Sequence, residues 1–356
     1  MSLAPGAVIG ILGGGQLGRM TALAAAALGY RCHVFADETQ SPASQVCAAA
    51  TVAPFTDADA LARFAAAVDV ATFEFENIPA EAVQRVAAAV PVMPRPEILE
   101  ITQDRLREKG FLRSIGTATT EFRAIENPAA LPAALAALGA PAVLKSVRMG
   151  YDGKGQVTIA DPAEAAEAWR RMGSDLGILE AFVDFVAEIS VVVARGADGA
   201  VAAYPSVENR HVNHILDTTV APADLPAKIR GEAEAIARHI AEKLDLVGVL
   251  AVEMFVAKSG ALLVNELAPR PHNSGHWTID ACLTSQFEQL VRAVCGLPLG
   301  STERHSDAVM KNLIGDEVST WPDALKDPSA KLHLYGKAEV KPGRKMGHVT
   351  RLLPRT

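Results

Sequence analysis

The stretch IGILGGGQLGRM, residues 9 to 20, most narrows what this chain can fold into. A short apolar run, three consecutive glycines and the start of a helix predict a buried strand that turns tightly into a helix. Gly13, Gly15 and Gly18 have the G-x-G-x-x-G spacing with which glycines let a backbone approach a pyrophosphate at the positive end of a helix. Taken alone, the stretch favours a dinucleotide-binding dehydrogenase.

The first hundred or so residues alternate between strand and helix patterns, as expected for a parallel sheet with crossover helices. The expected strands are residues 7–12, 31–36 and 70–76, and the expected helices are 16–29, 57–68 and 79–89. Prolines and then a charged helix follow in residues 91–116. We therefore expect a doubly wound α/β domain over residues 1–108.

The pattern changes after residue 117. Strands are expected at 141–147, 155–160, 187–195 and 201–207, helices at 163–172 and 225–246, and a hairpin at 247–267 with its turn at 257–260. Three short strand-like segments follow at 308–315, 330–337 and 348–353. These segments predict a central domain over 109–298 and a small β-domain over 299–356.

Composition narrows the possible partners. The formal net charge is −7, from 34 basic and 41 acidic side chains, and no block of Lys and Arg favours a nucleic-acid partner. No apolar run reaches the roughly 18 residues that a membrane span needs, and the N-terminus lacks the pattern of a secretory signal. We therefore expect a cytoplasmic protein with neither a nucleic-acid nor a membrane partner.

Two carboxylates in the hairpin suggest a metal site. If four turn residues joined Val256 to Ala261, Glu253 would lie opposite Val264, and Glu266 would be its diagonal neighbour on the same face, roughly 7–8 Å away. Carboxylates that close repel each other unless a cation lies between them, and Mg²⁺ carrying substrate phosphates takes such ligands. A pair of carboxylates at the rim, facing water, fits the same pattern, and the residues alone leave both interpretations open.

The segment KSVRMGYDGKGQ, residues 145–156, combines three glycines with two lysines. Gly150, Gly153 and Gly155 predict a mobile loop, and Lys145 and Lys154 can bring positive charge to phosphate oxygens. The segment lacks the Walker pattern. A surface hairpin loop with solvated lysines is the alternative.

Six segments in order carry a family resemblance: GGGQLGRM, FEFENIP, GYDGKGQ, YPSVENRH, NELAPRPHNSGHWT and LYGKAEVKPGRKMGHV. Together they resemble the N5-carboxyaminoimidazole ribonucleotide synthetases, ATP-grasp enzymes of purine biosynthesis, from about Ile9 to the C-terminus. One departure is Met149, which stands where the family commonly has a glycine before Gly150.

The resemblance implies an ATP-grasp fold with a Rossmann-like N-terminal domain and a small C-terminal β-domain. It further implies a homodimeric ligase that uses ATP, Mg²⁺ and bicarbonate. In that family ATP phosphorylates bicarbonate to carboxyphosphate, and the carbon dioxide released from it forms a carbamate on the amine of aminoimidazole ribonucleotide. The glycine-rich stretch at residues 13–18 would then line the ribonucleotide site instead of holding NAD.

The resemblance also implies roles for individual positions. The ATP site would comprise Arg105, Lys145, Gly150, Tyr151, Asp152, Gly153, Lys154, Gly155, Gln156, Glu180, Ala181, Phe182, Val183, Glu188, His211, Asn265 and Glu266. Glu253 and Glu266 would hold the metal, and the catalytic set would be Arg270, His272, Asp152 and Lys154. The ribonucleotide would contact Gln16, Leu17, Glu76, Tyr151, Lys337 and Arg344.

Two other classes of function stay in view: an NAD-dependent oxidoreductase and a non-catalytic nucleotide-binding regulator. Hydride transfer needs neither the hairpin carboxylates nor the loop of lysines and glycines, so these features favour the ligase. The regulator would differ from the ligase only in lacking turnover.

Overall fold

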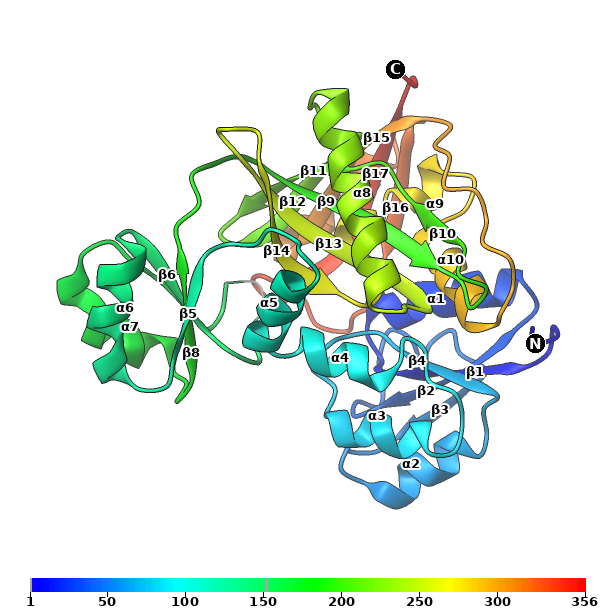
Figure 1. The fold of residues 1–356 in the computed structure, drawn as a ribbon. Coiled ribbons are helices and arrows are strands. Elements are labelled where there is room, and N and C mark those ends of the chain that lie inside the picture. The colour runs from blue at the N-terminus through cyan, green and yellow to red at the C-terminus, as the bar shows by residue number, and fades with distance from the viewer. Residues whose placement is uncertain (1, 151–152) are drawn as a thin grey trace.

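The computed structural model describes residues 2–150 and 153–356 of the chain. Its strands form three sheets, with the N-terminal sheet below the large sheet and the small sheet to the left in Figure 1. Tyr151 and Asp152, which we expected at the substrates, lie outside the described residues. Within the described part, every helix is too short or too polar to cross a membrane.

The N-terminal sheet is parallel throughout, in the order β3-β2-β1-β4. Its strands are Val8–Leu12 (β1), Arg31–Ala36 (β2), Ala49–Val52 (β3) and Val70–Phe73 (β4), and its helices are Gln16–Ala27 (α1), Ala58–Ala65 (α2) and Ala80–Ala87 (α3). The expected α/β alternation is confirmed. Strand β3 was missed because its four residues are largely exposed and lack an apolar pattern, and β4 ends three residues earlier than expected.

Glu74, the residue after β4, closes the N-terminus of α1. Its carboxylate accepts hydrogen bonds from the backbone N–H of Gly15 and, at 2.9 Å, of Gly18. A Cβ on Gly13 would lie 2.4 Å from Glu74 Cγ, and one on Gly15 would lie 2.5 Å from Glu74 Oε1. The glycines therefore make room for an internal carboxylate, which takes the place of an external anion at the positive end of α1.

A small antiparallel sheet, in the order β5-β8-β6-β7, follows two connecting helices. The connecting helices are Pro96–Thr102 (α4) and Arg105–Ser114 (α5). The strands are Phe122–Ile125 (β5), Ala142–Ser146 (β6), Gln156–Ile159 (β7) and Gly177–Ala181 (β8). Helices Leu131–Leu138 (α6) and Ala165–Met172 (α7) cover one face of this sheet and share its apolar core (Figure 1).

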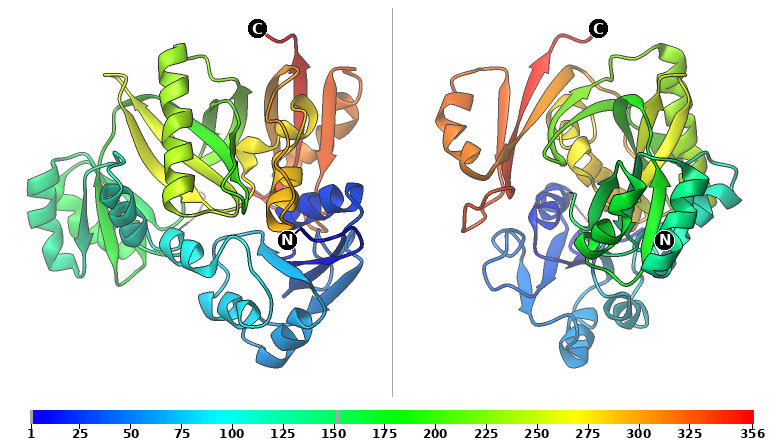
Figure 2. Two further views of the ribbon diagram at one scale, coloured as in Figure 1. Left: turned by 45° about the vertical axis from the view of Figure 1, so that its right-hand side comes forward. Right: turned by 90° about the vertical axis from the view of Figure 1, so that its left-hand side faces the viewer.

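The large sheet runs β14-β13-β9-β11-β12-β15-β17-β16, with β10 also paired to β9. Its strands are Phe185–Arg195 (β9), Val201–Ala203 (β10), Val207–Val212 (β11), Ile215–Ala221 (β12), Gly248–Ala257 (β13), Leu262–Ala268 (β14), Asp307–Ile314 (β15), Ala330–Leu334 (β16) and Lys345–Leu353 (β17). The accompanying helices are Ala227–Lys243 (α8), Thr278–Ala281 (α9), Gln286–Val294 (α10) and Trp321–Ala324 (α11). Figure 2 shows α8 lying along this sheet.

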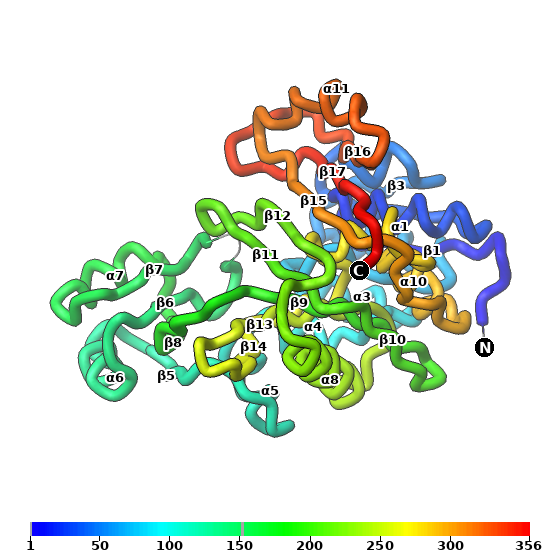
Figure 3. Tube along the Cα trace, turned by 90° about the horizontal axis from the view of Figure 1, so that it is seen from above, coloured from blue at the N-terminus to red at the C-terminus, as the bar shows by residue number. Residues whose placement is uncertain are grey.

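The last three strands extend the large sheet, because β15 pairs with β12. The segment that we expected as a separate small domain therefore shares a sheet with the central one, and seen from above it curves back over the N-terminal part (Figure 3). The boundaries after residues 108 and 298 stay a prediction.

The register of the β13–β14 hairpin differs from the expected one at two places, the loop and a β-bulge. Ala257 bonds to Ala261, so the loop has three residues and ends at Gly260, whose φ of 84° is left-handed. A β-bulge then shifts the pairing between Glu253 and Met254, so that Glu253 lies directly opposite Glu266. The expected diagonal arrangement was therefore wrong, and the two carboxylates are closer neighbours than a regular hairpin would make them.

The glycine turn yields a test of stability. Gly13→Ala places a Cβ against Glu74 at a φ of 107°, so we expect it to destabilise the fold by roughly 2–4 kcal/mol. Gly110→Ala is the control, because Gly110 lies in α5 with nothing within 4 Å of an added Cβ, and it should stabilise by about 1 kcal/mol. Thermal unfolding of both variants measures the difference, and equal melting temperatures would contradict the close approach of Glu74.

Candidate functional site

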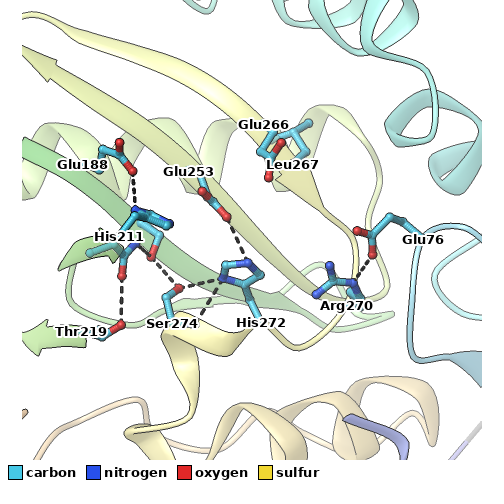
Figure 4. A network of polar contacts seen from close by, with 12 residues as sticks. Glu76, Glu188, His211, Thr219, Glu253, Glu266, Leu267, Arg270, His272 and Ser274 are labelled. Carbon is cyan, nitrogen blue, oxygen red and sulfur yellow. Dashed lines mark hydrogen bonds and ion pairs between the residues drawn. The ribbon is translucent and has the colours of Figure 1, made fainter. Parts of the chain in front are cut away.

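The opposed carboxylates of the hairpin each hold a cationic or hydrogen-bonding partner. Glu266 Oε2 lies 3.2 Å from Nη1 of Arg105, at the start of α5. Glu253 Oε1 lies 3.0 Å from Nε2 of His272. Figure 4 shows Glu253 and Glu266 on neighbouring strands, with His272 and Arg270 reaching toward them from the segment after β14. Five of the expected site residues therefore meet at one edge of the large sheet: Arg105, Glu253, Glu266, Arg270 and His272.

Helix α5 holds the bulged strand through two buried ionisable side chains that we missed in the sequence. Lys109 Nζ donates to the backbone oxygen of Asn265 at 2.9 Å and lies 3.3 Å from that of Val264. Glu108 Oε1 accepts the backbone N–H of Leu267 at 2.8 Å. These contacts bracket Glu266 on both sides along the chain. Their only signal in the sequence was the charged helix itself, which resembles an exposed helix.

The donor set near the bulge suits magnesium. Asn265 Oδ1 is buried and has no hydrogen-bond partner among the described residues, so it is an oxygen ligand still to be satisfied. Two opposed carboxylates and this oxygen are ligands that Mg²⁺ takes when it also carries phosphates. In residues 2–150 and 153–356, no group of three or more His, Cys, Asp or Glu side chains is placed to hold a metal by itself.

A buried charged cluster lies on the small sheet beside this edge. Lys145 Nζ is 2.8 Å from Glu180 Oε2, and Lys109 Nζ is 3.8 Å from Glu180 Oε1. Burial alone would raise the pKa of Glu180, but the two lysine charges lower it to about 2. The side chain of Glu180 therefore binds the two lysines.

Other expected nucleotide residues lie around this cluster. An ideal Cβ on Gly150 would lie 3.4 Å from Arg105 Nη2, and one on Gly153 would meet the ring of His214. The backbone oxygen of Gly155 accepts from Ser146 at 2.7 Å, and Gln156 Nε2 lies 3.4 Å from His214 Nδ1. The described residues of the glycine loop therefore lie between Arg105 on one side and His214, in the turn between β11 and β12, on the other.

Glu188 and His211 form an ion pair on neighbouring strands, with His211 Nδ1 2.7 Å from Glu188 Oε2 (Figure 4). Burial would lower the pKa of His211, but the hydrogen bond and charge of Glu188 raise it above its ordinary value. The structure thus brings together the two residues expected at the nucleotide, and it engages them with each other.

Arg270 and Glu76 also pair with each other. Arg270 Nε donates to Glu76 Oε2, and burial, which would raise the pKa of Glu76, is outweighed by the Arg270 charge, so that this pKa is about 2. The pair joins the N-terminal domain to the segment after β14. Glu76, expected to contact the ribonucleotide, therefore lies beside Arg270, expected in the catalytic set.

A cavity of about 720 Å³ separates the start of α1 from the C-terminal strands. Gln16, Lys337 and Arg344, all expected at the ribonucleotide, line it together with Lys154 and with Lys345, a cation of the same C-terminal run to which we had assigned no role. The side chain of Leu17, in contrast, is buried in a core cluster with Met20, Phe287 and Tyr335, so only its backbone can face a ligand.

The His211–Glu188 pair predicts a pH-dependent contribution to stability. Because the pKa of His211 is raised by folding, its stabilisation is fully present below the ordinary value near 6.5 and is lost as pH rises through the folded pKa. The melting temperature of the wild type should exceed that of Glu188→Gln by about 1–2 °C more at pH 5.5 than at pH 9. A difference that does not change with pH would contradict the ion pair.

Models of three protein families match the chain in order along its length. A ribonucleotide synthetase preATP-grasp domain matches residues 7–103, and an ATP-grasp domain matches residues 110–287. A phosphoribosylaminoimidazole carboxylase C-terminal domain matches residues 308–355. The expected ATP-grasp fold is confirmed.

The N5-carboxyaminoimidazole ribonucleotide synthase of Brucella melitensis is 50% identical over 357 residues, which cover 100% of this chain and 99% of that protein. The bifunctional purine synthesis protein purC/E of Dictyostelium discoideum is 49% identical over 98% of this chain, but the match spans only 37% of that longer protein.

Solved structures agree with the sequence relatives. An ADP complex of N5-carboxyaminoimidazole ribonucleotide synthetase superimposes with a TM-score of 0.96 at 42% identity, covering 99% of this chain and 94% of that one. The N5-carboxyaminoimidazole synthase of Aspergillus clavatus, solved with ADP and 5-aminoimidazole ribonucleotide, gives a TM-score of 0.91 at 32% identity, covering 98% and 94%. Identity at this level along the whole length shows that the chain belongs to the N5-carboxyaminoimidazole ribonucleotide synthase family of ATP-grasp ligases.

Proposed function

We propose that this protein carboxylates 5-aminoimidazole ribonucleotide to N5-carboxyaminoimidazole ribonucleotide, using ATP and bicarbonate, in purine biosynthesis. The observation that carries the proposal is the adjacency of two half-sites. The opposed carboxylates and the Lys145 cluster suit a metal and nucleotide phosphates. The basic cavity beside α1 suits a second, phosphorylated substrate, and Lys154 lines that cavity from the same glycine loop that borders the nucleotide side.

In the nucleotide half, Lys145 and Arg105 would neutralise phosphate oxygens, and Glu188 would accept hydrogen bonds from the ribose once His211 releases it. Glu253 and Glu266 would hold magnesium, with the Asn265 oxygen beside them. When bound, magnesium neutralises charge on the transferred phosphate. The buried lysines would remain in place as fixed charges, which need no reorganisation during the reaction.

In the other half, Arg270 and His272 would hold bicarbonate. A bicarbonate oxygen attacks the terminal phosphorus of ATP, ADP leaves, and the resulting carboxyphosphate breaks down to phosphate and carbon dioxide. The amine of the ribonucleotide adds to the carbon of carbon dioxide and loses one proton, which leaves a carbamate. Tyr151 and Asp152 would approach the imidazole, and both lie outside the described residues.

Exclusion of water is the second requirement, because carboxyphosphate hydrolyses readily. The glycine loop is the part of the site suited to closure, since Gly153 and Gly155 take left-handed φ values of 80° and 71°. Closure of such a loop brings Lys154 over the phosphates and shields the intermediate.

The glycine-rich turn argues against an oxidoreductase. The position at which a dinucleotide pyrophosphate would meet α1 is taken by the carboxylate of Glu74. A cytoplasmic location remains a prediction from the sequence pattern. A homodimer is a proposal from the family resemblance, and light scattering coupled to size exclusion measures it.

One assay tests the proposed reaction. Phosphate release from MgATP and bicarbonate should require magnesium and rise on addition of aminoimidazole ribonucleotide. A protein that binds ATP and the ribonucleotide without turnover would be the regulator, and saturable NAD binding without ATP binding would overturn the proposal.

Charge removal at the hairpin tests the metal site. Glu253→Gln and Glu266→Gln keep the size of each side chain but remove a negative charge, so the fold should survive while turnover falls by roughly two or more orders of magnitude. Steady-state rates at limiting magnesium measure the effect. Near-native rates for both variants would contradict the metal site and show that these carboxylates face water at the rim.

Substitution of Arg344 and Lys337 tests whether these side chains bind the phosphate of the ribonucleotide. A charge-assisted hydrogen bond contributes roughly 1.5–3 kcal/mol, so Arg344→Met and Lys337→Met should each raise the Michaelis constant for the ribonucleotide roughly 10- to 150-fold. The constant for ATP should change little, because its phosphates would lie at Lys145 and the metal. We would withdraw the assignment if both constants rose together or if neither changed.

A further inference from the structure

Gln286, a fully buried side chain on α10, makes two hydrogen bonds with the main chain of His272. The backbone N–H of His272 donates to Gln286 Oε1 at 2.9 Å, and Gln286 Nε2 donates to the backbone oxygen of His272 at 2.7 Å. The same Nε2 lies 3.1 Å from Nδ1 of His276. A glutamine can both accept and donate in this way, and every polar atom of this amide is used.

The ring of His272 is held by a second set of contacts. Its Nδ1 lies 2.8 Å from Ser274 Oγ and 3.4 Å from the backbone nitrogen of Ser274. Ser274 Oγ is 2.6 Å from Ser190 Oγ, which accepts from Asn209 Nδ2 at 2.9 Å, and Thr219 donates to Asn209 Oδ1 at 3.0 Å (Figure 4). All four partners are buried.

The contacts of the ring define its neutral form. The backbone N–H of Ser274 is directed at Nδ1, and the Ser274 hydroxyl can donate to the same atom. Nδ1 is then an acceptor, and the ring proton of neutral His272 lies on Nε2, the atom that faces Glu253.

We propose that Gln286 and Ser274 are positioning residues that hold His272 as an N–H donor in the anion half of the site. Gln286 holds the backbone and Ser274 holds the ring, so Nε2–H stays directed at the place where an anionic oxygen is bound. The inference rests on the proposed function in one respect, namely that His272 binds bicarbonate or carboxyphosphate.

The same helix offers a matched control. Gln289, also fully buried, makes the same pair of hydrogen bonds with the main chain of Gly300. The Gly300 N–H donates to Gln289 Oε1 at 2.9 Å, and Gln289 Nε2 donates to the Gly300 oxygen at 2.6 Å. Gly300 belongs to the connection before β15 and contributes no side chain to the site. Gln289→Met therefore removes the same hydrogen bonds without releasing His272.

Gln286→Met and Gln289→Met should lower the melting temperature by similar amounts. Only Gln286→Met should lower kcat/KM for bicarbonate, by about 10- to 100-fold, the usual cost of losing a partner that orients a site residue. Its Michaelis constant for ATP should stay within about twofold of the wild type. Equal losses in both variants, or an unchanged kcat/KM for bicarbonate in Gln286→Met, would overturn the proposal.

Two further measurements keep the test decisive. If Gln286→Met does not fold, Ser274→Ala should show the same selective loss for bicarbonate, and normal bicarbonate kinetics in that variant would overturn the proposal. The long-range ¹H–¹⁵N spectrum of the imidazoles, with His272 assigned from His272→Gln, should show the Nε2–H tautomer in the wild type. An Nδ1–H tautomer overturns the inference whether or not the protein carboxylates the ribonucleotide, so this result separates it from a failure of the proposed function.

Discussion

The site depends on one extra residue in β14. Val264 and Leu267 both pack in the core under the large sheet, although residues three apart on a regular strand point to opposite faces. The bulge resolves this conflict and places Glu266 opposite Glu253. Bulged backbone leaves ladder groups unpaired, and here Lys109 and Glu108 of α5 pair with them. A buried ammonium likewise needs acceptors, which the bulge and two threonines supply. The strand and the helix therefore specify each other, and the position of the proposed metal ligands follows from their fit.

Much of this architecture could be predicted from the sequence, because alternating apolar patterns are local. The βα units, the hairpin and the carboxylates at Glu253 and Glu266 were all visible in that way. The register was not, since it depends on a three-residue loop and a bulge that no period-two pattern contains. Lys109 and Gln286 were missed for another reason. Charged and amide side chains are usually exposed, and only tertiary partners far along the chain make their burial favourable.

The glycine-rich turn shows how one local geometry serves different purposes. A helix N-terminus attracts any anion, and tightly packed glycines allow close approach whether the anion is a pyrophosphate or a side chain. Here Glu74 arrives from the end of β4 and satisfies the N–H groups of Gly15 and Gly18. The glycine spacing therefore correctly predicted a helix N-terminus that binds an anion. It did not reveal which anion, because Glu74 lies some 60 residues further along the chain, outside the motif.

Three carboxylates of the site face nitrogen donors: Glu76 faces Arg270, Glu253 faces His272, and Glu266 faces Arg105. The cost of leaving such a charge unpaired is greatest at Glu253, whose side chain is only 16% exposed. Pairing keeps the donors in place before any substrate arrives. In the proposed reaction, Glu253 and Glu266 would hold the metal, and His272 and Arg105 would then be free to bind anionic oxygens of the substrates. Metal and anion binding would thus be coupled by exchange of partners, because each is more favourable once the other has occurred.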